Sequence, residues 1–194
     1  MEKLRGTFIT SVANKDGFLE TDKKIIAIAG KSNVGKSSLI NFIAGQKKLA
    51  KTSVTPGRTR LVNYFDFGDF ILADLPGYGF ANVSKAEKQK WADLMEDFFN
   101  LTEIDHVFSL IDIRHSPTAD DKNMINFLYA RMLPFTVVAT KADKLGKTRI
   151  KPQVTTLANE LKMTANDVIA TSSESGYGGD ALIEKIKEII KQGS

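Results

Sequence analysis

The stretch Gly30-Lys31-Ser32-Asn33-Val34-Gly35-Lys36-Ser37 decides the fold expected of this chain. It matches the pattern GxxxxGK[ST], whose glycines let successive backbone N–H groups turn toward phosphate oxygens. A continuously apolar run at residues 25–29 precedes it, and apolar residues at helical spacing follow it at 39–43. Strand, loop and helix in this order predict a phosphate-binding loop, in which Lys36 reaches the terminal phosphates and Ser37 coordinates Mg²⁺.

Apolar runs and helical patterns alternate along the rest of the chain. A hairpin is expected where residues 61–67 and 70–73 flank a Gly68-Asp69 turn, and Pro152 is expected to make one helix begin at Lys151. Further strands are expected at 107–111, 135–139 and 168–170, and helices at 84–99, 118–130, 151–161 and 180–191. This alternation predicts a three-layer α/β fold with a mostly parallel sheet of about six strands. We expect one domain over 1–194, with 1–23 as an N-terminal arm or edge strand.

Composition narrows the class of protein. The chain has 194 residues, of which 42% are hydrophobic and 26% charged, and this balance is ordinary for a globular domain. It has no cysteine and two histidines, which excludes disulfides, thiolate sites and a histidine-rich metal site. The N-terminus lacks the apolar run of a signal peptide, and no stretch is long enough to span a membrane. We therefore expect a cytoplasmic protein without membrane insertion.

Two later segments favour guanine over adenine. Thr140-Lys141-Ala142-Asp143 follows an apolar run and is similar to the NKxD motif, with threonine in place of asparagine. A carboxylate at Asp143 can accept hydrogen bonds from N1 and N2 of guanine, whereas adenine would leave it unpaired at a cost of about 1–3 kcal/mol. Thr171-Ser172-Ser173 follows the next apolar run and is similar to the short loop whose N–H meets guanine O6.

The switch segments are expected between these motifs. Asp74-Leu75-Pro76-Gly77 matches DxxG, so Asp74 would hold Mg²⁺ through water and the Gly77 N–H would contact the γ-phosphate. Thr59 is the expected first-switch threonine, with Thr52 and Thr55 as alternatives, and its hydroxyl would coordinate Mg²⁺ only when the triphosphate is bound. The expected catalytic residues are Lys36, Thr59 and Gly77. The full set expected to contact GTP or GDP comprises Gly30, Lys31, Ser32, Asn33, Val34, Gly35, Lys36, Ser37, Ser38, Gly57, Arg58, Thr59, Arg60, Leu61, Asp74, Leu75, Pro76, Gly77, Thr140, Lys141, Ala142, Asp143, Thr171, Ser172 and Ser173.

Together these motifs resemble one group of proteins. The chain resembles the EngB (YihA/YsxC) family of TrmE-Era-like bacterial GTPases. The segments that carry this resemblance are the phosphate loop, Pro56-Gly57-Arg58-Thr59, Asp74-Leu75-Pro76-Gly77-Tyr78-Gly79-Phe80-Ala81, Asp112-Ile113-Arg114-His115-Ser116-Pro117 and the TKAD segment. The resemblance runs from about residue 5 to the C-terminus. It implies a Ras-like P-loop GTPase domain and a role in assembly of the large ribosomal subunit. An older assignment to normal cell division and septation is also implied.

Other residues bear on GTP hydrolysis and on partners. Ras-like GTPases carry a water-orienting glutamine after DxxG, where this chain has Tyr78, so slow intrinsic hydrolysis is expected. A partner could supply the missing group, or Asn33 could help hold a monovalent cation such as K⁺; alternatively, Asn33 only tolerates a tight loop conformation. Basic residues without acidic neighbours mark a candidate rRNA contact, although some could simply balance the triphosphate: Lys47, Lys48, Lys51, Arg58 and Arg60.

Two alternative functions would need further sequence features. A nucleotide-locked scaffold at the division site would need an amphipathic or polymerising segment, and a small-molecule P-loop kinase would need an arginine-bearing lid. The carboxylates Asp120 and Asp121 are interpreted as N-capping residues of the helix at 118–130, and Arg114 is left undecided. A monomer is expected.

Overall fold

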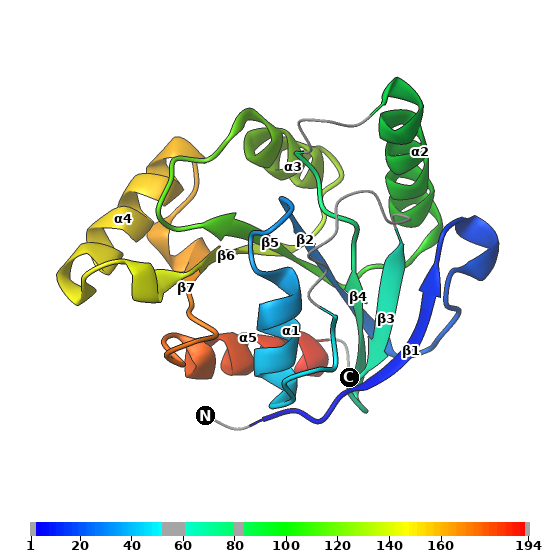
Figure 1. Ribbon diagram of the computed structural model, residues 1–194, viewed down its shortest axis with the longest axis horizontal. Helices are drawn as coiled ribbons and strands as arrows, with labels where there is room; N and C mark the ends of the chain where they lie inside the picture. Colours follow the sequence, from blue (N-terminus) through cyan, green and yellow to red (C-terminus); the bar gives the residue numbers. More distant parts are fainter. Residues whose placement is uncertain (1–2, 52–60, 80–83, 193–194) are drawn as a thin grey trace.

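The computed structural model describes residues 3–51, 61–79 and 84–192. Its central feature is a sheet of seven strands in the order β1-β3-β4-β2-β5-β6-β7 (Figure 1). The pairs β1–β3 and β3–β4 are antiparallel, and the remaining pairs are parallel. The strands are β1 (Thr7–Val12), β2 (Lys24–Gly30), β3 (Val62–Asp66), β4 (Phe70–Asp74), β5 (His106–Asp112), β6 (Phe135–Thr140) and β7 (Val168–Ala170). The three-layer α/β class is confirmed, and the sheet has one strand more than the six expected because the N-terminal segment contributes the edge strand β1.

Helices cover both faces of this sheet. They are α1 (Lys36–Ala44), α2 (Lys85–Leu101), α3 (Ala119–Ala130), α4 (Lys147–Glu160) and α5 (Gly179–Lys191). Alternate residues of β2 point to opposite faces, as the pleat requires. Ile26 and Ile28 pack with α1 and α5, whereas Ile25 and Ala27 pack with α2 and α3. The third part of the core lies between α4 and the strands β5 and β6.

Local signals explain most helix starts. Ser84 and Glu87 form the expected capping box of α2, with Ser84 N donating to Glu87 Oε2 at 3.0 Å. Thr118 and Asp121 form a second box at α3, so the interpretation of Asp121 as a capping residue agrees with the structure. Parallel strands then end at one edge of the sheet, and the loops that follow β2, β4, β5 and β6 meet there.

The expected start of α4 was wrong. The helix begins at Lys147, four residues before Lys151, and Pro152 lies inside it. Proline removes one backbone hydrogen bond from the helix, yet the preceding turn is retained because Ile150 is buried in the core under α4. Packing of one apolar side chain therefore outweighs the local signal of the proline.

Burial of His106 at the start of β5 yields a prediction about acid stability. The Nε2 atom lies 2.9 Å from Thr136 Oγ1, and burial, aided by the charge of Lys185, lowers the histidine pKa to about 4. The His106 imidazole takes up a proton more readily in the unfolded chain than in the folded one. The free energy of unfolding therefore falls as pH falls from about 6.5 toward about 4, by up to about 3 kcal/mol. Urea unfolding at several pH values should show this loss in wild type and its reduction in His106→Gln. The exposed His115→Gln variant is the control, and equal acid sensitivity of wild type and His106→Gln would contradict the assignment.

Candidate functional site

The loop between β2 and α1 has the backbone shape that phosphate binding requires. Gly35 caps α1 with φ +114° and Asn33 has φ +64°, so both lie in the left-handed region. Asparagine tolerates this conformation better than most residues, which accounts for Asn33 without reference to any ligand. The turn is closed by Val34 N donating to Lys31 O at 3.1 Å, and the first N–H groups of α1 point into it. Lys36 and Ser37 follow at the start of this helix.

The DxxG segment lies directly against the phosphate loop. Leu75 N donates to Ile28 O and Ser32 N donates to Tyr78 O, both at 3.0 Å. A Cβ atom at Gly77 would lie 2.9 Å from Ser32 Oγ and 3.2 Å from Lys36 Nζ. A side chain at this position would crowd both atoms, so glycine suits the close approach to the loop, and Gly77 lies near Lys36, the lysine expected to contact phosphate.

Asp74 fits a role as part of a magnesium site. Its side chain is buried, and Oδ1 has no hydrogen-bond partner among the described residues. Burial raises the pKa of Asp74 to about 6, although the charge of Lys36 opposes this shift. A buried carboxylate oxygen without a partner is unfavourable unless a ligand completes it, and hydrated Mg²⁺ is the type of ligand that a carboxylate beside phosphates binds.

The loop after β6 is held onto the phosphate loop by two side chains. Thr140 Oγ1 donates to Val34 O at 2.7 Å, and Lys141 Nζ donates to Asn33 O at 2.9 Å. The hydroxyl of Thr140 thus makes a cross-loop contact that explains why a threonine can occupy this position. Lys141, which has φ +63°, also forms an ion pair with Asp112 at 3.0 Å.

Asp143 is oriented by the loop that follows β7. Ser172 Oγ donates to Asp143 Oδ1 at 2.6 Å and accepts from the backbone N of Ser175 at 3.0 Å. This hydrogen bond is the main cause that lowers the pKa of Asp143, so the carboxylate is ionised and can accept further N–H donors. Ala142 N also donates to Thr171 O at 3.0 Å, which joins the two loops through the backbone.

The turn behind Thr171 and Ser172 tolerates only glycine at one position. Gly178 has φ +70°, and a Cβ there would lie 1.9 Å from Ala170 O. The turn closes through Ser172 N, which donates to Tyr177 O at 2.9 Å. The sequence pattern identified the serines but gave no indication that Gly178 holds them in place.

Arg114 lies near the site and has a role that the sequence left undecided. Arg114 donates to Asp112 through Nε at 2.9 Å and Nη2 at 2.7 Å. Burial alone would raise the pKa of Asp112, but its hydrogen bonds with Arg114 and Lys141 hold it well below the usual range. Arg114 therefore orients the carboxylate that fixes Lys141, a role that sequence spacing does not reveal.

Tyr78 occupies the position at which Ras-like proteins carry glutamine, but its side chain is engaged elsewhere. The ring is buried and the phenol donates to Asp121 Oδ1 at 2.9 Å. Burial and the charge of Asp121 raise the pKa of this phenol far above its usual value. In this structure the tyrosine hydroxyl links the segment after DxxG to the start of α3.

The structure brings together the phosphate loop, the DxxG segment, the TKAD segment and Thr171-Ser172-Ser173, and Leu61 lies half-buried just before β3. The expected contacts Gly57, Arg58, Thr59 and Arg60, and the alternatives Thr52 and Thr55, lie outside the described residues. None of the helices described is both long and apolar enough to cross a membrane.

Comparisons with known proteins agree with this geometry. Residues 25–141 match the family described as 50S ribosome-binding GTPase. A probable GTP-binding protein EngB of Finegoldia magna is 45% identical over 87% of this chain and 86% of its own length. A second, from Desulfitobacterium hafniense, is 41% identical over 96% of this chain and 94% of its own length.

A solved structure extends the comparison to three dimensions. The crystal structure of a probable GTP-binding protein engB superposes with a TM-score of 0.72 at 25% identity, covering 87% of this chain and 99% of that one. Sequence and fold thus agree with those of the relatives along most of the chain. The chain belongs to the EngB family of GTP-binding proteins and is a guanine-nucleotide-binding GTPase.

Proposed function

We propose that this chain is a Mg²⁺-dependent GTP switch that acts in assembly of the large ribosomal subunit. The observation that supports the switch is the contact of Gly77 and Tyr78 with the phosphate loop, since a bound γ-phosphate would contact the chain at this point. The description of the matching family as ribosome-binding supports the partner. A role in normal cell division and septation would then follow from the supply of ribosomes, and a cytoplasmic location suits both.

Mg²⁺ would be held by Ser37, Thr59 and, through water, Asp74. When bound, the ion neutralises charge that develops on the phosphate oxygens. Lys36 and the N–H groups at the start of α1 orient the phosphates, and the Gly77 N–H donates to the terminal phosphate. Asp143, held by Ser172, selects guanine by accepting from its N1 and N2.

Intrinsic hydrolysis is proposed to be slow because Tyr78 is tied to Asp121 and cannot orient the attacking water as glutamine does. Either a partner supplies a catalytic group, or K⁺ held with the help of Asn33 compensates. The exposed position of Asn33 within the phosphate loop is compatible with such a cation.

The rRNA contact is proposed for the basic segment after α1. Lys47, Lys48 and Lys51 are exposed on a loop that Asn41 fixes to the helix. The amide of Asn41 donates to Ala50 O at 2.9 Å and accepts from Ala50 N at 2.7 Å. The lysines are therefore presented on an ordered loop, which suits a surface that meets phosphates. Arg58 and Arg60, which the sequence adds to this candidate contact, lie outside the described residues.

Binding of purified large subunits in sedimentation assays, with GTP analogue against GDP, tests the ribosomal role. Tighter binding with one nucleotide supports the proposal, whereas absence of binding with either contradicts it. A scaffold at the division site would instead bind the large subunit with neither nucleotide. A kinase would transfer phosphate to a small acceptor molecule. Among the residues that the structure describes, no particular contact favours either alternative.

Asp143→Asn should convert base specificity. The variant loses the acceptor for N1 and N2 of guanine, so GDP affinity should fall about tenfold to a hundredfold while xanthosine diphosphate affinity rises. Isothermal titration with both nucleotides measures this change. Asp22→Asn, an exposed site on another part of the chain, should bind like wild type. Unchanged GDP affinity in Asp143→Asn would refute the assignment of the base site.

Asp74→Asn should weaken the binding of Mg²⁺ without weakening the fold. The Mg²⁺ concentration for half-maximal GTP hydrolysis should rise by about tenfold or more, as is usual for groups that hold a metal-bound water. In EDTA at neutral pH the thermal midpoint should equal or exceed that of wild type, because a buried ionised carboxylate is removed. The exposed Asp69→Asn serves as control. A lower midpoint with unaltered magnesium dependence would identify Asp74 as a purely structural residue.

Replacing Lys47, Lys48 and Lys51 together by alanine should reduce the salt dependence of subunit binding. Each lost phosphate contact lowers the log–log slope by about one unit, so a decrease of about three is expected. Alanine at Lys15, Lys85 and Lys90, which are also exposed, is the matched control. Equal slopes for the two triple variants would show that the loop does not meet RNA.

A further inference from the structure

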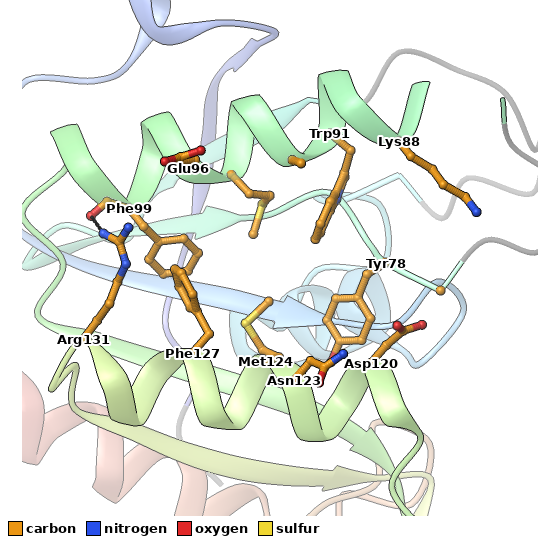
Figure 2. A pocket seen from close by; sticks show the side chains of 13 residues that line it. Tyr78, Lys88, Trp91, Glu96, Phe99, Asp120, Asn123, Met124, Phe127 and Arg131 are labelled. Carbon is orange, nitrogen blue, oxygen red and sulfur yellow. Dashed lines mark hydrogen bonds between the residues drawn. The ribbon is translucent and has the colours of Figure 1, made fainter. Parts of the chain in front are cut away.

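A groove of about 810 Å³ lies between α2 and α3, on the face of the sheet opposite α1 and α5 (Figure 2). Apolar side chains from both helices form its floor, among them Trp91, Met95, Phe99, Met124 and Phe127. Along α2 the floor extends from Trp91 to Phe99, a distance of about 12 Å or about two turns of helix. None of the expected nucleotide contacts among the described residues lines this groove, so it is separate from the base and phosphate site.

Two hydrogen bonds connect the groove to the DxxG segment. Trp91 Nε1 donates to Pro76 O at 3.1 Å, and Tyr78, which lines one end of the groove, donates to Asp121 at the start of α3. Both helices are thus attached to the segment expected to respond to the γ-phosphate. Whatever fills the groove contacts residues whose positions depend on this segment.

The charges on the rim indicate what kind of molecule fits. Lys88 and Asp120 lie at the Tyr78 end, and Glu96 and Arg131 lie at the other end (Figure 2). Arg131 is fixed by Nη1, which donates to Asn100 Oδ1 at 2.6 Å. A carboxylate at each end disfavours a nucleic-acid backbone and an anionic membrane, because both would need cations alone. Alternating signs around an apolar floor instead complement a protein segment with charges of both signs.

We propose that the α2/α3 groove docks an amphipathic helix of a protein carried on the large-subunit particle. Its apolar residues, spaced i, i+4 and i+7, would cover the floor, and charged residues on its flanks would pair with Lys88, Glu96, Asp120 and Arg131. The inference that the partner is carried on the large subunit depends on the proposed function. The inference that the partner is a helix depends on the groove itself. The contact links the partner to the DxxG segment through Trp91 and Tyr78.

Two alanines on α2 give a matched test. Ala92 lines the groove and is exposed, whereas Ala86 is exposed on the same helix but outside it. Ala92→Arg should obstruct the groove without disturbing the core and should weaken sedimentation with purified large subunits by about tenfold or more. Ala86→Arg should change it by less than about twofold, and both variants should bind GDP like wild type. Wild-type binding by Ala92→Arg would overturn the docking proposal.

Photo-crosslinking identifies the occupant. Asn123 lines the groove and Asn126 does not, although both are exposed on α3. With p-benzoylphenylalanine at position 123, crosslinks to a subunit protein are expected and should map to a helix, while position 126 gives few. Crosslinks from position 123 to rRNA, or equal yields from both positions, would overturn the inference and leave the proposed function intact. Failure of wild type to sediment with subunits would overturn both.

Discussion

The nucleotide site depends on the attachment of the loop after β6 to the phosphate loop. Thr140 Oγ1 and Lys141 Nζ donate to the carbonyls of Val34 and Asn33, which lie 106 and 108 residues away in the chain. These contacts fix the distance between the part of the site that binds phosphate and the part that reads the base. This separation must match the distance between the base and the phosphates of the bound nucleotide to within about 0.5 Å.

The two sides of the site are built differently. On the base side, Asp143 is fixed through Ser172, and the turn behind Ser172 is fixed by Gly178. On the γ-phosphate side, the DxxG segment rests on the phosphate loop through backbone contacts and reaches α3 through one phenol. The base site is thus pre-organised, whereas the DxxG segment is linked to the helices α2 and α3. This arrangement suits a protein that acts by changing its surface conformation and not by fast hydrolysis.

Sequence patterns predicted most of this architecture for identifiable reasons. The phosphate loop and the buried strands have strong local signatures, and the capping boxes at Ser84 and Thr118 are short-range chemistry. The start of α4 could not be predicted, because burial of Ile150 overrides the proline signal only in the folded chain. Likewise the pairing of Tyr78 with Asp121, the pairing of Lys141 with Asp112 and the apolar groove arise from residues that are distant in sequence, for which a single sequence carries no pairing signal.

The central claim is that this assembled site is selective for guanine nucleotides. Isothermal titration of the wild-type chain with GDP and ADP in Mg²⁺ tests it most directly. GDP is expected to bind at least about a hundredfold more tightly than ADP, since adenine offers the ionised Asp143 no pair of N–H donors like N1 and N2 of guanine. Equal affinities for GDP and ADP would contradict it, because the Asp143–Ser172 arrangement would then not read the base.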